Sequence, residues 1–251
     1  MTNSPNNSHD AIIIYALDFA DSKAACQEID KLYPEITFFK VGLELFLASS
    51  WEVVDYVLNK GGKVMLDLKF LDIPATVAAA VKQVNQHKGV SLLTVHGHKQ
   101  TIQAAVAARE NLDMKILGVT LLTSFGPADM LEFTVTDPKN INRLDITPPY
   151  ITPLDLVLAR AKSSLDAGAD GLVASATEAK ELRSAYGDDF VLVTPGIRFD
   201  ASDDDQQRVA TPQVALANGA NYLVIGRPIR EAADPLAKVH AIKKLLSVPP
   251  Q

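Results

Sequence analysis

The chain has 251 residues, of which 47% are hydrophobic and 22% charged, close to the average of globular proteins. This composition excludes a disordered, collagen-like or coiled-coil chain, and the length suits one or two domains or a single α/β barrel. With a net charge of −6, the protein lacks the excess of basic residues that is typical of nucleic-acid-binding proteins, so we expect no nucleic-acid partner. Any anionic ligand must then be bound by a local group of basic residues or backbone N–H groups.

Cysteine content and apolar run length bear on the compartment. The single cysteine, Cys26, allows no internal disulfide and suits a reducing, cytoplasmic environment. No run of 18 apolar residues is present that could span a membrane. Residues 1–10 are polar without an apolar core, so we expect a disordered N-terminal tail and not a signal peptide.

Strand-like and helix-like segments alternate from residue 11 to the end of the chain. The strands are predicted at residues 11–17, 37–41, 63–69, 90–95, 115–122, 171–174, 190–194 and 222–225. The helices that follow them are predicted at about residues 22–33, 43–58, 74–87, 99–110, 153–167, 177–185, 212–218 and 235–246. Residues 126–149, rich in Pro, Asp, Thr and Asn, form a long excursion with at most a short helical piece.

Eight strand–helix units in about 240 residues match the number and length of a (β/α)8 barrel. A doubly wound open sheet is the alternative, but such sheets seldom carry eight evenly spaced units. We therefore predict an α/β protein with one domain, residues 11–251, folded as a (β/α)8 TIM barrel.

Charged side chains interrupt the apolar strands near their C-terminal ends, where barrels of this kind carry their active sites. Asp67 and Lys69 differ by two positions and so share one face of the third strand. If that face is the barrel interior, Asp18 and Lys40 converge on it, with Asp72 at the rim. A salt-bridge network that only closes the barrel is the alternative, but so many alternating charges at this face favour a functional site.

A second group of residues follows the seventh and eighth strands, where barrels often bind phosphate. Gly196 and Gly226 allow close approach of the backbone, and Arg227 offers a bidentate fork to a phosphate. The alternative is that the glycines serve turns and the arginines lie at the surface. The longer loop also holds Arg198, Gln206 and Gln207.

Two other residue types carry less weight. His96, at the end of the fourth strand, is a candidate general base, although a structural histidine is as common there. Cys26 is more typical of a packed residue than of a nucleophile. No spacing of His and Cys indicates zinc.

Six short segments together resemble the signature of the orotidine 5′-phosphate decarboxylase family. They are residues 16–18 (ALD), 40–42 (KVG), 67–76 (DLKFLDIPAT), 122–124 (LTS), 194–198 (TPGIR) and 224–228 (VIGRP). Their order is that of the family, and the resemblance covers about residues 11–246. The segment at about 132–149 looks longer than the usual connection after the fifth strand.

This resemblance implies decarboxylation of orotidine 5′-monophosphate to uridine 5′-monophosphate, the last step of de novo pyrimidine biosynthesis, without a cofactor or metal ion. Lys69 would protonate C6 of the pyrimidine after carbon dioxide leaves, and Asp67 would face the departing carboxylate. A homodimer is implied, in which Asp72 and Thr76 reach the partner's site. Lys40 completes the implied catalytic set.

The resemblance also implies a set of substrate contacts. Lys40 and Asp18 would hold the ribose hydroxyls, and Thr123 and Ser124 would lie at the base. The phosphate would be bound by Gln206, Gly226 and Arg227, with Arg198 nearby.

Two other functions remain open on the sequence. A sugar-phosphate decarboxylase or aldolase of the same superfamily would use Mg²⁺ near the same carboxylates, although Thr76, Thr123 and Ser124 favour a nucleotide. A phosphate-binding sensor without catalysis would have no need for the opposed charges of Asp67, Lys69 and Asp72. Activity that survives a chelator would distinguish the orotidine 5′-monophosphate decarboxylase from the enzyme that uses Mg²⁺.

Overall fold

The computed structural model describes residues 13–125, 129, 152–199 and 210–247. The expectations for the N-terminal tail, for Gln206 and for residues 126–149 apart from Asp129 concern residues outside these ranges.

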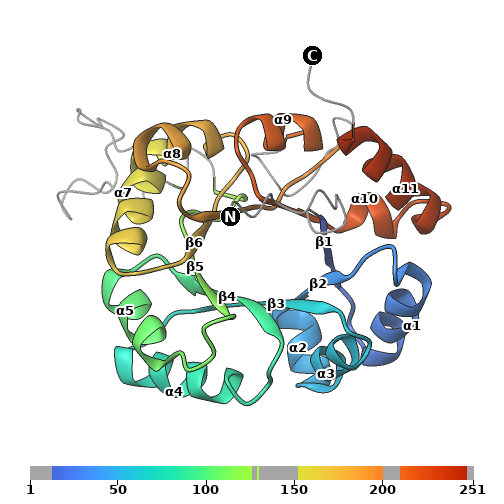
Figure 1. The fold of residues 1–251 in the computed structure, drawn as a ribbon, viewed down its shortest axis with the longest axis horizontal. Helices are drawn as coiled ribbons and strands as arrows, with labels where there is room; N and C mark the ends of the chain where they lie inside the picture. The colour runs from blue at the N-terminus through green and yellow to red at the C-terminus, as the bar shows by residue number, and fades with distance from the viewer. Residues whose placement is uncertain (1–12, 126–128, 130–151, 200–209, 248–251) are drawn as a thin grey trace, which may run out of the picture.

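Eight parallel strands form a closed barrel in which each strand pairs with the next and β8 pairs with β1 (Figure 1). The strands are β1 (Ile13–Ala16), β2 (Phe38–Gly42), β3 (Lys63–Phe70), β4 (Val90–His96), β5 (Lys115–Val119), β6 (Gly171–Val173), β7 (Val191–Thr194) and β8 (Tyr222–Ile225). Ile14 lies opposite Val224 where the barrel closes. The predicted (β/α)8 barrel is therefore confirmed, and an open sheet is excluded.

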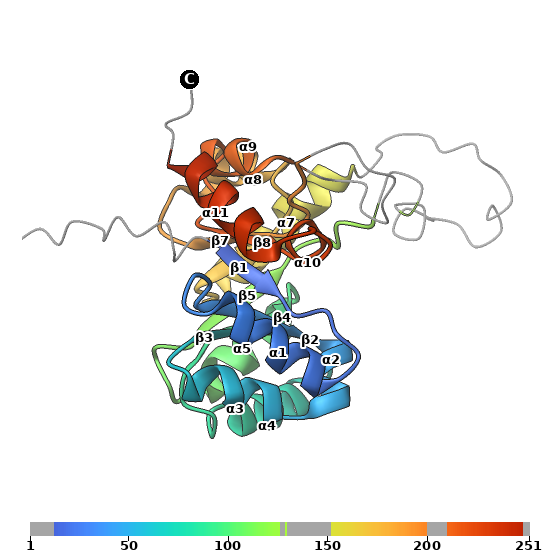
Figure 2. The same cartoon turned by 90° about the vertical axis from the view of Figure 1, so that its right-hand side faces the viewer.

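Helices surround the barrel in the order that the sequence predicts (Figures 1 and 2). They are α1 (Ser22–Leu32), α2 (Leu43–Ser49), α3 (Glu52–Asn59), α4 (Pro74–Val84), α5 (Lys99–Ala108), α7 (Pro153–Asp166), α8 (Ala179–Tyr186), α9 (Pro212–Ala217), α10 (Arg227–Arg230) and α11 (Pro235–Leu246). The Asp21 side chain caps α1 by accepting a hydrogen bond from the Ala24 N–H, and Pro74 occupies the first turn of α4. No helix within the described ranges is long and apolar enough to cross a membrane.

Three elements differ from the prediction. The single helix predicted at 43–58 is two helices, because Ser50 has a φ of 49° that an α-helix cannot continue. The strand predicted at 115–122 ends at Val119, and a turn follows in which the Phe125 N–H bonds to the Leu122 carbonyl. Helix α10 was not predicted, since one turn is too short to show a hydrophobic period.

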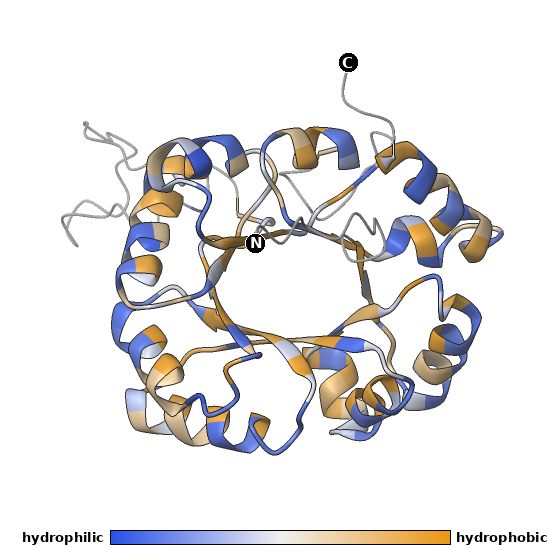
Figure 3. Cartoon of the chain, viewed as in Figure 1, coloured by the Kyte–Doolittle hydropathy of each residue, from blue (hydrophilic) through white to orange (hydrophobic). Residues whose placement is uncertain are grey.

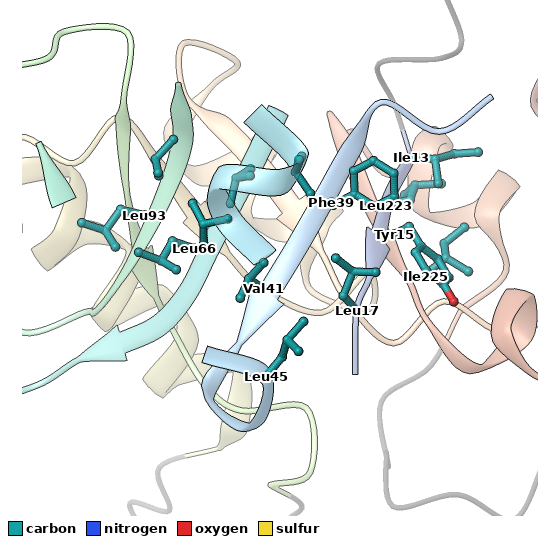
Figure 4. Close-up of a cluster of buried hydrophobic side chains, with 14 of the residues drawn as sticks. Ile13, Tyr15, Leu17, Phe39, Val41, Leu45, Leu66, Leu93, Leu223 and Ile225 are labelled. Carbon is teal, nitrogen blue, oxygen red and sulfur yellow. The ribbon is translucent and has the colours of Figure 1, made fainter. Parts of the chain in front are cut away.

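Alternation along the strands divides the buried side chains into two apolar layers. On β1, Ile13 and Tyr15 join the cluster between barrel and helices, whereas Ile14 and Ala16 join the cluster inside the barrel. Figure 4 shows part of the outer cluster, and Figure 3 shows the hydrophobic strands and the two-sided helices around them. The inner cluster consists of Ile14, Ala16, Phe38, Met65, Leu92, Leu117, Val119, Val173, Val193 and Val224.

The inner apolar layer fixes where the polar residues lie. Because inward positions recur every second residue, Asp18 follows Ala16, Lys40 follows Phe38 and Asp67 follows Met65 on the same side of their strands. These charged groups therefore stand above the apolar filling, at the C-terminal end of the barrel.

The tight contact between β6 and β7 predicts a stability effect. A Cβ atom on Gly171 would overlap the Val191 carbonyl oxygen and lie 2.8 Å from Val191 Cβ. We expect Gly171→Ala to lower the free energy of unfolding by about 1–3 kcal/mol, because neither backbone can give way in a closed sheet. Urea unfolding measures the change.

Gly187→Ala provides a comparison in which backbone strain acts alone. Gly187 has a φ of 76° and a ψ of −160°, a conformation almost confined to glycine, and a Cβ there meets nothing within 4 Å, so strain costs about 1–3 kcal/mol without any overlap. A loss in Gly171→Ala well below about 1 kcal/mol would contradict the steric explanation at Gly171.

Candidate active site

A cavity of about 300 Å³ opens where the strands end at the C-terminal face of the barrel. Its lining comes from the ends of every strand except β4 and from the segment after β5. Of the predicted site residues, the structure brings together Asp18, Lys40, Asp67, Lys69, Thr123, Ser124, Arg198, Gly226 and Arg227.

Four charged side chains form a row of alternating sign along β1, β2 and β3. The ammonium nitrogen of Lys40 lies 3.0 Å from Asp18 Oδ1 and 3.8 Å from Asp67 Oδ2. The Lys69 ammonium lies 2.9 Å from the other oxygen, Asp67 Oδ1. Only 12% of the Lys40 and Asp67 side chains is exposed, so each charge depends on its neighbour of opposite sign.

The Asp67 carboxylate is the central group of this row. Burial alone would raise its pKa, but the charges of Lys40 and Lys69 and hydrogen bonds from Lys69 and Thr94 hold the pKa of Asp67 below its usual range. The group is therefore ionised at neutral pH although it is buried. It presents a fixed negative charge beside the Lys69 ammonium.

Strand β3 is irregular at the position that carries Lys69. Its pairing with β4 passes from Leu66–Leu93 to Phe70–Val95, so residues 67–69 lie opposite Thr94 alone. Lys69 has a φ of 48°, a left-handed conformation that costs a non-glycine residue roughly 1–2 kcal/mol. This bulge turns the Lys69 side chain into the cavity beside Asp67.

The opposite part of the cavity is formed by the ends of β7 and β8. Gly196 has a φ of 78°, which favours glycine, and Arg198 follows it and donates its backbone N–H to the Ala210 carbonyl. A Cβ atom on Gly226 would lie 3.3 Å from Asp18 Oδ2, so only glycine fits without crowding this carboxylate. Arg227 also lines the cavity.

Sequence reasoning missed two residues that hold the site in place. Thr94 is fully buried and bonds to both Asp67 and Lys69. Thr94 lies two positions after Leu92, whose side chain faces the barrel interior, so strand alternation in the sequence could have identified it as an inward-facing polar residue. Arg230 donates from Nη1 to the Asp18 carbonyl oxygen at 2.8 Å, and nothing in the sequence indicated α10.

Asp72 and Thr76 lie outside this cavity. Both are exposed, and Asp72 Oδ1 accepts a hydrogen bond from the Ile73 N–H at the start of α4. Gln206, the remaining predicted contact, belongs to the residues that the structure does not describe.

His96 and Cys26 are not among the residues lining the cavity. Burial, followed by the charges of Arg160, His98 and Lys69, lowers the pKa of His96. Cys26 packs against the core, and burial raises the pKa of its thiol, as suits a packed residue. Across the described ranges, no group of three or more His, Cys, Asp or Glu side chains is placed to hold a metal ion.

A closed (β/α)8 barrel with a partly buried row of charges and an arginine-lined end at the C-terminal face defines a barrel enzyme for a small anionic substrate. A family model described as orotidine 5′-phosphate decarboxylase / HUMPS family matches residues 12–242. The chain belongs to this family.

Relatives and solved structures agree with this assignment. The orotidine 5′-phosphate decarboxylase of Rhodopseudomonas palustris (strain BisB5) is 43% identical over 231 residues, 92% of each chain. That of Chromobacterium violaceum is 42% identical over 241 residues, 94% of this chain and 92% of the relative. The crystal structure of orotidine 5′-phosphate decarboxylase from Lactobacillus acidophilus is similar, with a TM-score of 0.76 and 33% identity, covering 95% of this chain and 100% of that one.

The lowered pKa of Asp67 predicts how stability depends on pH. A carboxyl whose pKa is lower in the folded than in the unfolded state stabilises the fold above its ordinary pKa of 3.8, and this contribution is lost as the pH falls through the folded value. We expect Asp67→Asn to show a shallower loss of unfolding free energy below about pH 4 than the wild type.

Urea unfolding at a series of pH values measures this slope. Lys40→Met should also make the loss shallower, because it removes a positive charge that lowers the pKa of Asp67. Slopes as steep in both variants as in the wild type would show that Asp67 does not contribute.

Proposed function

We propose that this protein decarboxylates orotidine 5′-monophosphate to uridine 5′-monophosphate, with Lys69 as the proton donor to C6. The observation that carries the proposal is the Lys69 ammonium held 2.9 Å from the buried Asp67 carboxylate inside the cavity. Membership of the family and identities of 43% and 42% to relatives named orotidine 5′-phosphate decarboxylase support it.

The two ends of the cavity suit the two ends of this nucleotide. Arg227 and Gly226 would bind the phosphate with Arg198 nearby, since a guanidinium and close backbone suit its oxygens. Asp18 and Lys40, near the middle, would hold the ribose hydroxyls. The base would then lie beside Lys69, with Thr123 and Ser124 at its edge; Gln206 is proposed as a further phosphate ligand on the family resemblance.

The reaction breaks the bond between C6 and its carboxyl group and leaves the electron pair on C6. No adjacent π system delocalises this pair, so the site must stabilise it by fixed charge. The Lys69 ammonium is that charge: it faces the developing carbanion, transfers a proton to C6 and later regains one from water. Asp67, ionised beside it, faces the carboxylate before carbon dioxide leaves.

One ammonium group can account for only part of the reduction in the activation free energy. A pair of charges at 4 Å is worth about 4 kcal/mol at an effective dielectric constant near 20, whereas enzymes lower barriers by roughly 8–23 kcal/mol. Binding energy from the distant phosphate must supply much of the remainder by holding C6 against Lys69. Arg227 follows β8 whereas Lys69 lies on β3, so the phosphate and the base would lie at different sides of the cavity, which suits this division of roles.

The carboxylates in the cavity favour this reaction over one that depends on Mg²⁺. Asp18 and Asp67 each lie within 4 Å of an ammonium group. A divalent cation there would have to compete with Lys40 and Lys69 for the same oxygens. Turnover without added metal is therefore part of the proposal.

The decisive experiment measures loss of orotidine 5′-monophosphate by ultraviolet absorbance with purified protein and EDTA. We expect the wild type to turn over and Lys69→Ala to lose at least 1,000-fold in kcat, roughly the effect of removing a principal charge and the proton donor together. Circular dichroism confirms that the variant is folded.

Two results would count against the proposal. A wild type inactive on this nucleotide, or active only with added Mg²⁺, would reject the substrate or the metal-free mechanism. Substantial turnover by folded Lys69→Ala would reject Lys69 as the proton donor.

A homodimer is the second part of the proposed function. Four large apolar side chains are exposed on α2 and the β3–α4 loop, which follow neighbouring strands: Leu43, Leu47, Leu71 and Ile73, with exposures of 53%, 82%, 56% and 66%. Asp72 lies within this surface and outside its own cavity. Pairing of two copies through it would cover the apolar groups and bring Asp72 and Thr76 to the partner's site.

Mixed dimers test this shared site. Asp72→Ala and Lys69→Ala should each be inactive alone, but a hybrid dimer contains one intact site. Random exchange of equal amounts should therefore restore roughly a quarter of wild-type activity, because half of the dimers are hybrids with one working site each.

Differently tagged variants allow the hybrid to be isolated and assayed. Isolated hybrids without activity, or a protein that sediments as a monomer, would contradict the shared site.

A further inference from the structure

The Thr94 hydroxyl joins the backbone of Lys69 to the side chain of Asp67. Its Oγ1 accepts a hydrogen bond from the Lys69 N–H at 2.9 Å and lies 2.9 Å from Asp67 Oδ1. Thr94 has no exposed surface and is not among the residues that line the cavity. It therefore contacts the Lys69 backbone and the Asp67 carboxylate without lining the cavity.

Chemistry fixes the direction of both hydrogen bonds. A backbone N–H can only donate, so the Thr94 oxygen accepts from Lys69. An ionised carboxylate can only accept, so the Thr94 proton points to Asp67 Oδ1. Since the Lys69 ammonium donates to the same Oδ1, Thr94 and Lys69 together hold this oxygen and leave Oδ2 facing Lys40.

The same hydroxyl supports the bulge that aims Lys69. Residues 67–69 lie opposite Thr94 alone, where a regular ladder would give the Lys69 N–H a backbone carbonyl. Thr94 supplies the missing acceptor at the one residue of β3 with a positive φ. Without it, the partly buried Lys69 N–H would lack this partner in a conformation that is already disfavoured.

We propose that Thr94 is a positioning residue for the decarboxylation, which sets the placement of the Lys69 ammonium and the orientation of the Asp67 carboxylate. The inference rests on the proposed function, in which these two groups face the reacting carbon. Thr94 touches neither the substrate nor the reacting atoms. Its removal therefore affects the chemical step more than substrate binding.

Thr94→Val tests the inference, because valine keeps the shape and loses both hydrogen bonds. We expect kcat to fall about 10- to 100-fold, the range expected from misplacing a catalytic group by up to 1 Å, while KM changes by less than about threefold. Lowered stability alone would also reduce the apparent kcat at unchanged KM, so kcat is calculated from the concentration of folded enzyme, measured by circular dichroism, before it is compared with that of the wild type.

The pH profile gives a second readout that a purely structural role would not move. Lys40 and Lys69 face Asp67 from β2 and β3, Asp18 lies beyond Lys40, and His96 on β4 lies near Lys69. The Thr94 hydrogen bond helps to lower the pKa of Asp67, so its loss raises that pKa. The acidic limb of kcat/KM in Thr94→Val should therefore move to higher pH.

Two further variants serve as controls. Thr94→Ser retains the hydroxyl and should keep kcat within about threefold of the wild type, with an unmoved acidic limb. Thr101→Val makes the same substitution at a buried threonine on α5, outside the cavity lining, and should leave kcat and the limb unchanged. If Thr94→Val does not fold, Thr94→Cys replaces it, since a thiol is a weaker donor and acceptor.

The outcomes separate this inference from the proposed function. An inactive wild type rejects the function itself. An active wild type with wild-type kcat and acidic limb in folded Thr94→Val, or in Thr94→Cys where valine fails to fold, rejects the positioning role. A large loss of kcat in Thr94→Ser also rejects it, because the hydroxyl is still present.

Discussion

The ion pair between Asp67 and Lys69 is the interaction on which the rest of the site depends. A buried carboxylate is tolerated only when opposite charges and hydrogen-bond donors surround it, and Asp67 has Lys40 on one oxygen and Lys69 with Thr94 on the other. The row from Asp18 to Lys69 follows from this requirement. A lysine placed in this row suits a reaction that generates negative charge nearby, as the proposed function requires.

The closed barrel is what makes such a row possible. Neighbouring parallel strands bring residues 18, 40, 67 and 69 to one edge, although up to 51 positions separate them in the chain, from Asp18 to Lys69. The apolar filling below them, which includes Ala16 and Met65, excludes water from one side of the row. The charges therefore meet in a setting of low polarity, where each electrostatic contact is stronger than at the surface.

Most of the fold and much of the candidate site could be predicted from the sequence, because apolar and polar residues recur at the short regular spacings of strands and helices. Strands buried on both faces gave eight apolar runs, and alternation placed Asp67 and Lys69 on the inner face even though a bulge lies between Leu66 and Phe70. The bulge itself produces no recurring pattern of residues by which the sequence could reveal it. It depends on the hydroxyl of Thr94, which comes from a different strand, and so it emerges only when β3 and β4 are paired.

Other details escaped prediction because they rest on single residues or on distant contacts. The break between α2 and α3 depends on the backbone of Ser50, whose neighbours all suit a continuous helix. The roles of Asp72 and Thr76 rest on family resemblance, since a monomer's sequence carries no period that marks a surface shared with a second copy. Their exposed positions beside Leu71 and Ile73 supply the physical reason to place them at such a surface.

Asp18 joins the two ends of the cavity. Its carboxylate belongs to the charged row through Lys40, its carbonyl oxygen accepts a hydrogen bond from Arg230 of α10, and its side chain lies so near Gly226 that an added Cβ would crowd it. The segment that carries Arg227 is thus fixed against the group that begins the row. In the proposed function, a phosphate bound at Arg227 would act through the same contacts that hold Asp18 and Lys40. Binding energy gained there would then act on the alignment of the base beside Lys69, which is what the proposed reaction without an electron sink requires.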